Sequence, residues 1–474
     1  MTRVSPRPVR RRSTQRAAAV EITTFQSAMR YLYDRADIER MRAVSVDGRT
    51  FKLERMEEML AGLGDPHRAI RTVHVAGTVG KGSTVAMIDS MLRACGYAVG
   101  AYTSPHLVDI RERVQINGQM IGKNDFVELT RRMAEMTEKL DFEPTFFELM
   151  TAMAFTWFAE EAVDIAVIET GLGGRLDCTN VIIPETAVIT TIDFDHMHIL
   201  GKTLGAIAAE KAGIMKRGVP AFTVEQPAEV EQVLRDKAAE IGATLKVINK
   251  DIEFSYRFGT SPDKGPRSQV CLFTETSRFE HVPVPLPGEH QAFNCGLALA
   301  VIDLLRGAGY SLPEGKVHAG LAATTIPGRM ELVWNRPRIL VDGAHNAAAL
   351  ATLIRSVGAH VPYDSMVVVF GCCEDKDVYA MLEKVALGGD KVIFTRAKGV
   401  PRAADAADLQ QKFAERCGKM SQVAGDIEEA LNLASRAVGR EDLICVTGSF
   451  YLVGDTKKYL MELDKKRHVS AEIH

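Results

Sequence analysis

The feature that most constrains this 474-residue chain is a glycine-rich turn at residues 77–84, directly after a short apolar run. The turn reads Gly-Thr-Val-Gly-Lys-Gly-Ser-Thr. Glycines let backbone amides point at phosphate oxygens, a lysine adds positive charge, and the start of a helix adds its dipole. All three occur here in the order that a triphosphate requires. A nucleotide phosphate site is therefore favoured over a plain turn between a strand and a helix.

The turn departs from the common phosphate-loop pattern, in which Ser or Thr follows Gly-Lys directly. Gly82 occupies that place, and the hydroxyls of Ser83 and Thr84 come later. We therefore expect the hydroxyl that binds the metal to come from elsewhere in the chain. The residues of the turn that we predict to bind ATP are Gly77, Thr78, Val79, Gly80, Lys81, Gly82 and Ser83.

The surrounding pattern predicts an α/β domain with a mostly parallel sheet. Residues 73–76, 164–169 and 187–192 are continuous apolar runs, as expected of strands buried on both faces. Between Val85 and Cys95, apolar residues recur at helical spacing. A strand, a glycine loop and a helix in this order form the first unit of a P-loop ATPase-type domain.

A second α/β series follows further along the chain. The alternation weakens between residues 246 and 287, and residues 256–268, rich in Gly, Ser, Pro and Lys, predict an exposed turn region. We predict an ATP-binding central domain over residues 21–325, a hinge at 326–330 and a smaller, Rossmann-like C-terminal domain over 331–474. The strands expected in the C-terminal domain are residues 339–342, 366–370, 391–395 and 443–446.

The first twenty residues contain six arginines before the first acidic residue, Glu21. A disordered basic tail is the favoured interpretation, and an organelle transit peptide is the alternative. The formal net charge of the whole chain is −3, which argues against a nucleic-acid binder. No apolar run approaches the roughly 20 residues that a membrane helix needs, so no membrane partner is expected.

The eight cysteines form no Cys-x-x-Cys pair. This pattern favours reduced thiols in a cytoplasmic protein over a disulfide framework or a zinc site.

Further motifs follow the turn in a fixed order. The first is Thr-Ser-Pro-His-Leu, ending at Leu107, and the next is a glycine-rich segment that follows Glu169. Asp-Phe-Asp-His then ends at His196, and Glu-Lys-Ala-Gly contains Lys211. The later motifs are residues 287–294, 327–329 and 342–346. Together they resemble the folylpolyglutamate synthase and dihydrofolate synthase family of the Mur ligase superfamily, over about residues 25–460.

The resemblance implies that Ser104, Glu169 and His196 bind Mg²⁺. A lone carboxylate at the end of an apolar strand, such as Glu169, needs a partner. Because Mg²⁺ prefers oxygen ligands, chemistry alone would give His196 a structural or phosphate-binding role. The resemblance also implies that Lys211 is carbamylated and holds a second Mg²⁺. That modification needs a neutral amine, so the usual pKa of about 10.4 must be lowered; a surface lysine paired with Glu210 is the alternative.

The remaining site residues also follow from the resemblance. Asn294 and Asp342 would hold the adenine and ribose, Arg329 at the hinge would reach the ATP phosphates, and His345 would lie near the γ-phosphate. The implied catalytic residues are Lys81, His196, Lys211, Arg329 and His345. The implied acceptor-binding residues are Thr145, Phe147, Glu148, Leu176, Asp177 and Cys178.

Two departures from the family pattern stand out. Residues 51–55 lack the glycine that family members usually carry before the first strand, which bears on the fit of the acceptor. Val79 replaces the usual asparagine of the loop and changes only a side chain. For Phe147, ordinary core packing is the alternative to stacking on the acceptor.

The implied activity is an ATP-dependent ligase, acting as a cytoplasmic monomer with ATP and two Mg²⁺ ions. It would join L-glutamate to dihydropteroate or to a reduced folate through an acyl phosphate. One alternative is a Mur-type ligase acting on a nucleotide-linked peptidoglycan precursor. Another is a non-catalytic ATP-binding switch.

Overall fold

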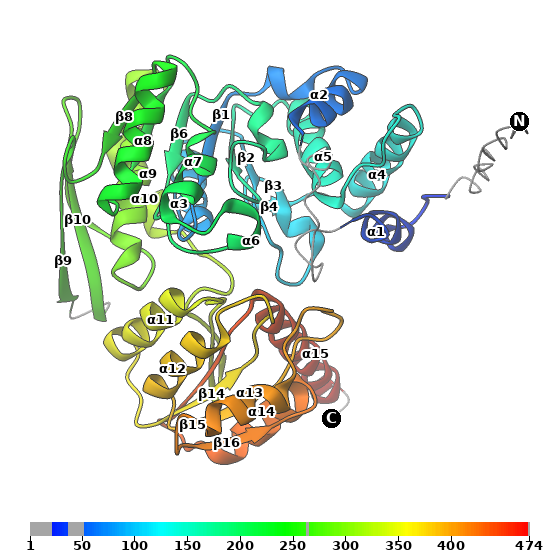
Figure 1. Cartoon of the computed structure of the whole chain (residues 1–474), viewed down its shortest axis with the longest axis vertical. Coiled ribbons are helices and arrows are strands. Elements are labelled where there is room, and N and C mark those ends of the chain that lie inside the picture. The colour runs from blue at the N-terminus through cyan, green and yellow to red at the C-terminus, as the bar shows by residue number, and fades with distance from the viewer. Residues whose placement is uncertain (1–20, 37–51, 262–264, 473–474) are drawn as a thin grey trace, which may run out of the picture.

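The computed structural model describes residues 21–36, 52–261 and 265–472. The predicted basic tail at residues 1–20 lies outside them. The described chain forms two α/β bodies that face each other, as Figure 1 shows. We call the part before residue 323 the N-terminal body and the part from residue 331 the C-terminal body. Among the described residues, we find no helix with the length and apolarity that crossing a membrane requires.

The N-terminal body is built on an eight-stranded sheet in the order β4-β3-β2-β5-β1-β6-β7-β8. Six neighbouring strands run parallel, in the order β2, β5, β1, β6, β7 and β8. Strands β3 and β4 add an antiparallel edge beside β2. The predicted strands at β1, β5 and β6 are confirmed, with ends shifted by a few residues. The strand bounds are β1 Thr72–Ala76, β2 Val99–Tyr102, β3 Val114–Ile116, β4 Gln119–Met120, β5 Ile165–Glu169, β6 Thr186–Ile189, β7 Pro220–Thr223 and β8 Thr244–Val247.

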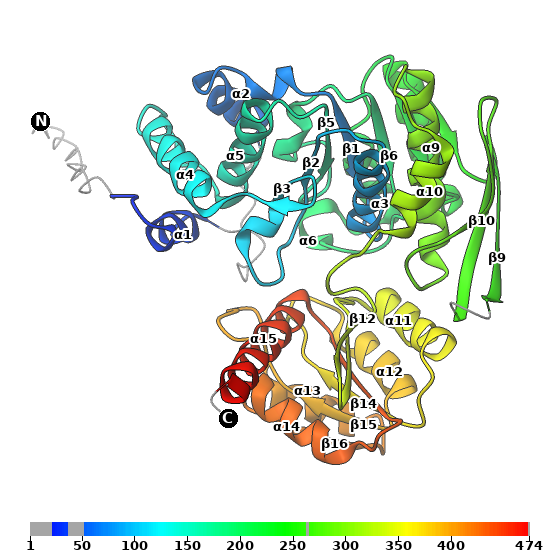
Figure 2. The same ribbon diagram turned by 180° about the vertical axis from the view of Figure 1, so that it is seen from behind.

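Helices cover both faces of this sheet (Figure 2). Val73 and Val75 of β1 pack with α3 and α9 on one face. Ala76, which points to the opposite face, packs with α7 and α8. The helix bounds are α1 Phe25–Tyr33, α2 Leu53–Gly62, α3 Lys81–Ala94, α4 Lys123–Thr137, α5 Phe146–Glu160, α6 Met197–Leu200, α7 Leu204–Ala212, α8 Ala228–Ile241, α9 His290–Gly307 and α10 Glu314–Ala322.

The predicted exposed turn at residues 256–268 is wrong for the described part of that segment. It belongs to β9 (Glu253–Ser261) and β10 (Gly265–Phe273), which pair antiparallel and continue into β11 (Arg278–Pro283). The polar composition misled the prediction because this small sheet is buried on one face only. Its apolar side chains, such as Val270 and Leu272, pack into the same core as α9.

The C-terminal body carries a six-stranded sheet in the order β12-β13-β17-β14-β15-β16. The four predicted strands correspond to β13, β14, β15 and β17, and the α/β fold class is confirmed for both bodies. The strand bounds are β12 Glu331–Asn335, β13 Arg338–Val341, β14 Met366–Phe370, β15 Lys391–Phe394, β16 Met420–Val423 and β17 Leu443–Thr447. The helix bounds are α11 Ala347–His360, α12 Val378–Gly388, α13 Ala406–Ala414, α14 Ile427–Ala437 and α15 Phe450–Glu472.

Helices α3 and α10 cross at very short distance, which fixes the helix that carries the glycine-rich turn. Ser90 Oγ donates a 2.6 Å hydrogen bond to the carbonyl oxygen of Gly320. A Cβ at Gly320 would lie 2.5 Å from the Ser90 carbonyl oxygen and 2.7 Å from Met91 Cα. Gly315, in the same helix α10, would have no atom within 4 Å of an added Cβ.

We therefore expect Gly320→Ala to destabilise the protein by about 1–3 kcal/mol, because backbone atoms cannot move aside for the methyl group. Gly315→Ala should leave stability unchanged or raise it by up to about 1 kcal/mol, because it restricts the unfolded chain without a clash. Thermal unfolding of both variants checks this. Equal melting temperatures for the two variants would contradict the close crossing.

Candidate active site

A cavity of about 550 Å³ lies in a cleft between the two bodies and is lined by residues of both. The predicted site residues that line it are Gly77, Thr78, Gly80, Lys81, Gly82, Ser83, Ser104, Thr145, Phe147, Glu148, Glu169, Leu176, Asp177, Cys178, His196, Lys211, Arg329 and His345. Val79, Asn294 and Asp342 are not among the described residues that line it. The sequence motifs are thus brought together from ten or more separate elements into one space.

The glycine-rich turn leaves the carboxyl end of β1 and enters α3 at Lys81. Gly80 has a φ of +98°, and a Cβ there would lie 2.2 Å from Asn294 Oδ1. Gly77 has a φ of +150°, and its Cβ would lie 1.8 Å from Thr190 Oγ1. Only glycine satisfies both the backbone conformation and the close approach at these positions. Asn294, on α9, is buried and supports the turn from behind.

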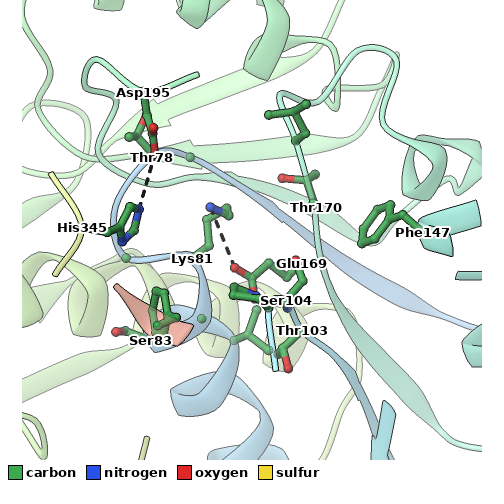
Figure 3. Close-up of a pocket in the computed structure, with 18 of the residues that line it drawn as sticks. Thr78, Lys81, Ser83, Thr103, Ser104, Phe147, Glu169, Thr170, Asp195 and His345 are labelled. Atoms are coloured by element: carbon green, nitrogen blue, oxygen red, sulfur yellow. Dashed lines mark hydrogen bonds and ion pairs between the residues drawn. The ribbon is translucent and has the colours of Figure 1, made fainter. Parts of the chain in front are cut away.

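Glu169 lies at the carboxyl end of β5, next to the turn. Because β1 and β5 are adjacent parallel strands, their carboxyl ends meet at the same edge of the sheet. The Glu169 carboxylate is buried, with Oε1 3.9 Å from Lys81 Nζ and Oε2 accepting a 3.2 Å hydrogen bond from the Ser104 amide. Figure 3 shows Lys81, Glu169 and Ser104 side by side in the cavity.

Lys211, near the end of α7, is buried rather than exposed. Its Nζ donates a 2.7 Å hydrogen bond to the carbonyl oxygen of Gly77. Burial and the positive charge of Lys81 lower the pKa of Lys211 to about 7. The alternative, a surface lysine paired with Glu210, is wrong, because Glu210 pairs with Arg175 at 2.8 Å. A lysine with a pKa of about 7 has a substantial neutral fraction near pH 7, which meets the chemical requirement for carbamylation.

His196 precedes α6 in a left-handed conformation, with a φ of +48°. Burial lowers the pKa of His196 to about 4, against the opposing effect of Asp195, and the charge of Lys211 contributes to the lowering. The imidazole is therefore neutral at physiological pH and able to act as a ligand or acceptor.

Asp195 connects the two bodies across the cleft. Lys376 Nζ, from the C-terminal body, lies 2.5 Å from Asp195 Oδ1, and His345 Nε2 lies 3.5 Å from Oδ2. Figure 3 shows Asp195 facing His345. Burial opposes ionisation, but the hydrogen bond from His345 and the charge of Lys376 hold the pKa of Asp195 well below its usual range.

Sequence analysis singled out neither Asp195 nor Lys376 as a site residue. The signal for Asp195 was its position beside His196 in one motif. Lys376 follows β14 in a segment with no distinctive pattern, so only the folded chain brings it to the cleft.

Arg329 and Asp342 lie where the chain enters the C-terminal body. The Arg329 guanidinium stacks 4.5 Å from the centroid of the Phe450 ring and faces the cavity. The Asp342 carboxylate accepts hydrogen bonds from the amides of Met330, at 2.9 Å, and Ala344, at 2.8 Å. Asp342 therefore shapes the backbone around Arg329 in this structure.

The predicted acceptor residues form the end of the cavity beyond Glu169. Thr145 caps α5, and Glu148 completes the capping box. Arg55 Nε and Nη2 each lie 2.9 Å from a Glu148 carboxylate oxygen. Phe147 lies against Tyr102 with its ring centroid 5.8 Å away, and Gly171 leaves room for the Phe147 ring, which a Cβ there would approach to 2.3 Å. One face of Phe147 is thus packed while the residue still lines the cavity.

Comparison with known families finds matches in both bodies. The Mur ligase middle domain model matches residues 75–302, and the Mur ligase glutamate ligase domain model matches residues 328–450. The chain is 36% identical to the dihydrofolate synthase/folylpolyglutamate synthase of Bacillus subtilis, over 86% of this chain and 94% of that protein. It is 32% identical to the Escherichia coli protein of the same name, over 88% of this chain and 92% of that one.

Solved structures show the same likeness. Mycobacterium tuberculosis folylpolyglutamate synthase complexed with ADP superimposes with a TM-score of 0.83 at 32% identity, covering 92% of this chain and 98% of that one. Escherichia coli FolC in complex with DHPP and ADP superimposes with a TM-score of 0.80 at 30% identity, covering 94% and 99%.

We expect Gly80→Ala to weaken ATP binding by about tenfold or more, because strain at positive φ and the clash with Asn294 each cost roughly 1–3 kcal/mol. Gly96→Ala is the matched control. Gly96 has a φ of +101° but no atom within 4 Å of an added Cβ. It should lower stability by about 1–2 kcal/mol through backbone strain alone and leave ATP affinity unchanged. Calorimetric titration with ATP separates the two; equal ATP affinities would contradict the role of the close approach.

Proposed function

The chain belongs to the dihydrofolate synthase/folylpolyglutamate synthase family and is an ATP-dependent glutamate ligase of folate metabolism; on that premise, we propose that one site joins L-glutamate to both dihydropteroate and reduced folates. The observation that carries this proposal is the continuity of the cavity. It runs from the phosphate loop past Glu169 to Phe147, so a nucleotide and an aromatic acceptor could bind in it end to end. The relatives named for both activities support a single site for both acceptors.

The alternatives of a peptidoglycan-precursor ligase and a non-catalytic switch have no observation in their favour. The relatives that this chain resembles are named for dihydrofolate or folylpolyglutamate synthesis. The cavity also contains a complete set of charged groups suited to phosphoryl transfer, from both bodies.

We propose a reaction in two steps. The acceptor carboxylate attacks the γ-phosphorus of ATP, the bond from γ-phosphorus to the bridging oxygen breaks, and ADP leaves with that electron pair. The glutamate amine then attacks the acyl carbon of the acyl phosphate, the bond from carbon to the phosphate oxygen breaks, and phosphate leaves while the nitrogen loses a proton. Positioning and charge neutralisation account for most catalysis of phosphoryl transfer.

The chain's own residues supply that positioning and charge. Lys81 and the amides of the glycine-rich turn bind the phosphates, and Arg329 approaches them from the hinge. The Asp195–Lys376 ion pair holds the two bodies together over the cavity, which shields the acyl phosphate from water. His345 Nδ1 lies 2.9 Å from the Gly343 carbonyl oxygen, which directs the other ring nitrogen toward Asp195.

The donor set fits two Mg²⁺ ions when ATP is also bound. No group of three His, Cys, Asp or Glu side chains that would hold a metal alone occurs in the described part of the chain. Mg²⁺ at nucleotide sites binds one or two protein oxygens and completes its shell with phosphates and waters. Ser104, Glu169 and His196 would hold one ion, and a carbamylated Lys211 would hold the other. Bound there, Mg²⁺ would neutralise charge that develops on the phosphates.

We further propose that the enzyme acts as a monomer in the cytoplasm. The two bodies of a single chain bring the predicted site residues together, so the proposed chemistry needs no second copy. All eight cysteines are free, as expected of a reducing compartment.

We expect the purified protein, given ATP, Mg²⁺ and labelled L-glutamate, to incorporate label with dihydropteroate and with tetrahydrofolate in separate reactions. Phosphate release should require both the acceptor and glutamate, since each step consumes one of them. Omission of the acceptor is the control. Slow hydrolysis indifferent to acceptor and glutamate would indicate a switch, and no incorporation with either acceptor would refute the proposal.

We expect Lys211→Ala to abolish ligase activity, with partial recovery in formate or acetate, because a small carboxylate replaces the carbamate oxygens. Lys211→Arg is the matched control, since it keeps the positive charge and cannot be carbamylated; it should be inactive and not rescued. Activity retained by Lys211→Arg would contradict the carbamate.

The pH dependence follows from the lowered pKa. The amine is protonated below pH 7 and neutral above it, because the pKa of Lys211 is about 7. Carbamylation joins the neutral amine to carbon dioxide with loss of one proton. Enzyme freed of carbon dioxide should therefore recover activity faster at pH 8 than at pH 6 when both samples are given the same concentration of dissolved carbon dioxide. Recovery that is independent of pH would show that the neutral amine is not the reacting form.

A further inference from the structure

A buried chain of hydrogen bonds joins the strand that carries the phosphate loop to the acceptor end of the cavity. His74, on β1, is fully buried, and its Nε2 lies 2.9 Å from Thr179 Oγ1. Thr179, in the short 3-10 helix Cys178–Val181, is also fully buried. Its Oγ1 donates to Asp177 Oδ1 at 2.5 Å. None of the proposed catalytic steps uses His74 or Thr179.

The donor and the acceptor of each hydrogen bond in this series follow from the protonation of Asp177. Asp177 accepts two backbone amides, as a carboxylate does, so the single hydroxyl proton of Thr179 is donated to Asp177. Thr179 Oγ1 must then accept a hydrogen bond from His74 Nε2–H. His74 is thereby fixed in the Nε2–H tautomer, and its Nδ1 has no partner among the described residues. Burial keeps this imidazole neutral, because it lowers the pKa of His74 to about 3.

Asp177 closes the loop that borders the acceptor. Its Oδ2 accepts a 2.8 Å hydrogen bond from the Leu172 amide, and its Oδ1 accepts a 3.0 Å hydrogen bond from the Thr179 amide. The carboxylate therefore pins both ends of the loop at residues 171–180. Leu176 and Cys178, on either side of Asp177, line the cavity.

The same loop rests on the end of α7. A Cβ at Gly174 would lie 2.8 Å from the Glu210 carbonyl oxygen and 2.9 Å from that of Lys211. Asn180 Nδ2 donates a 3.0 Å hydrogen bond to the Gly213 carbonyl oxygen. A shift of the loop would therefore move the acceptor wall with respect to both the phosphate loop and Lys211.

We propose that His74 is a positioning residue for the acceptor, which acts through Thr179 and Asp177 to hold the loop at residues 171–180 in register with the phosphate loop. The proposal rests on the ligase function proposed above. It assigns a role to a buried histidine that a purely structural account would treat as core packing. The two accounts differ in what the loss of these hydrogen bonds affects. A positioning role predicts selectively weaker acceptor binding, and core packing predicts lower stability alone.

Thr179→Val is the sharpest test, because it removes one buried hydroxyl. His74 Nε2–H then loses its acceptor and Asp177 Oδ1 loses its hydroxyl donor, while the backbone amides on Asp177 remain. His74→Leu removes the same chain at its other end, and His74→Gln keeps a donor of similar reach. We expect the first two variants to raise the KM for the acceptor by about tenfold, as for loss of a buried hydrogen bond, with the KM for ATP unchanged. His74→Gln should restore most of the acceptor affinity.

Thr186→Val is the matched control. Thr186 is equally buried on β6, next to β1, and its hydroxyl donates to the Pro220 carbonyl oxygen, away from the loop. It should lower the melting temperature and leave the KM for the acceptor unchanged. If Thr179→Val and His74→Leu alter the KM for the acceptor no more than Thr186→Val does, or raise the KM for ATP equally, the positioning role is refuted.

Hydrogen–deuterium exchange provides a readout that does not depend on ligase activity. We expect faster exchange over residues 168–181 in Thr179→Val, and not in Thr186→Val, because the Leu172 and Thr179 amides lose a firmly held acceptor. Unchanged exchange there would overturn the proposal even if the enzyme is active. Failure of the unmodified protein to ligate glutamate would instead refute the proposed function, with the exchange result still interpretable.

Discussion

The close approach of the glycine-rich turn to its surroundings is the constraint on which the rest of the site depends. Gly77 lies against Thr190 at the end of β6, and Gly80 lies against Asn294 of α9. The carbonyl oxygen of Gly77 accepts the hydrogen bond from Lys211. Thr78 Oγ1 donates to the Asp193 carbonyl oxygen at 3.0 Å, just before the residues that lead to His196. One turn therefore sets the positions of three other segments, and any side chain at residues 77 or 80 would displace them together.

The charged groups in the cavity are balanced by partners that come from both bodies. The charge of Lys81 disfavours the charge of Lys211, and Glu169 lies within 3.9 Å of Lys81 Nζ. Asp195 is held ionised by groups from the C-terminal body. A buried ion pair is costly to break by removing one partner, because the remaining charge stays unpaired in a poorly solvated space. The ionisation of the Asp195 carboxylate, in the N-terminal body, therefore depends on the position of Lys376 in the C-terminal body.

The sequence predicted what depends on local order along the chain. Apolar runs located β1, β5 and β14 because strands buried on both faces contain few polar residues. The turn was recognisable because its glycines, lysine and helix start are contiguous. The motifs of the acceptor end also line the cavity as a set.

What the sequence did not predict depends on partners far along the chain. The β9–β10 hairpin is stabilised by packing on α9, although its composition is that of a turn. The edge strand β12 is partly exposed and carries no continuous apolar run. Lys376 enters the cleft only because β14 ends there, 181 residues from its partner Asp195. For Asn294 and Asp342, the family pattern implied nucleotide contacts. In the structure Asn294 lies against Gly80, and Asp342 accepts hydrogen bonds from two backbone amides.

The neighbours of Gly82 explain why a glycine stands where the common phosphate-loop pattern has Ser or Thr. A Cβ at this position would lie 3.6 Å from Glu169 Oε2, in ordinary contact. A serine or threonine hydroxyl, which the common phosphate-loop pattern places here, would extend into the space beside that carboxylate. The backbone amide of Ser104 already approaches the same oxygen atom from the neighbouring strand's loop. The absence of a side chain at Gly82 therefore leaves room for Glu169 and Ser104 to meet at the phosphate loop. The proposed metal site needs this arrangement, because its hydroxyl ligand would then be Ser104, more than twenty residues away.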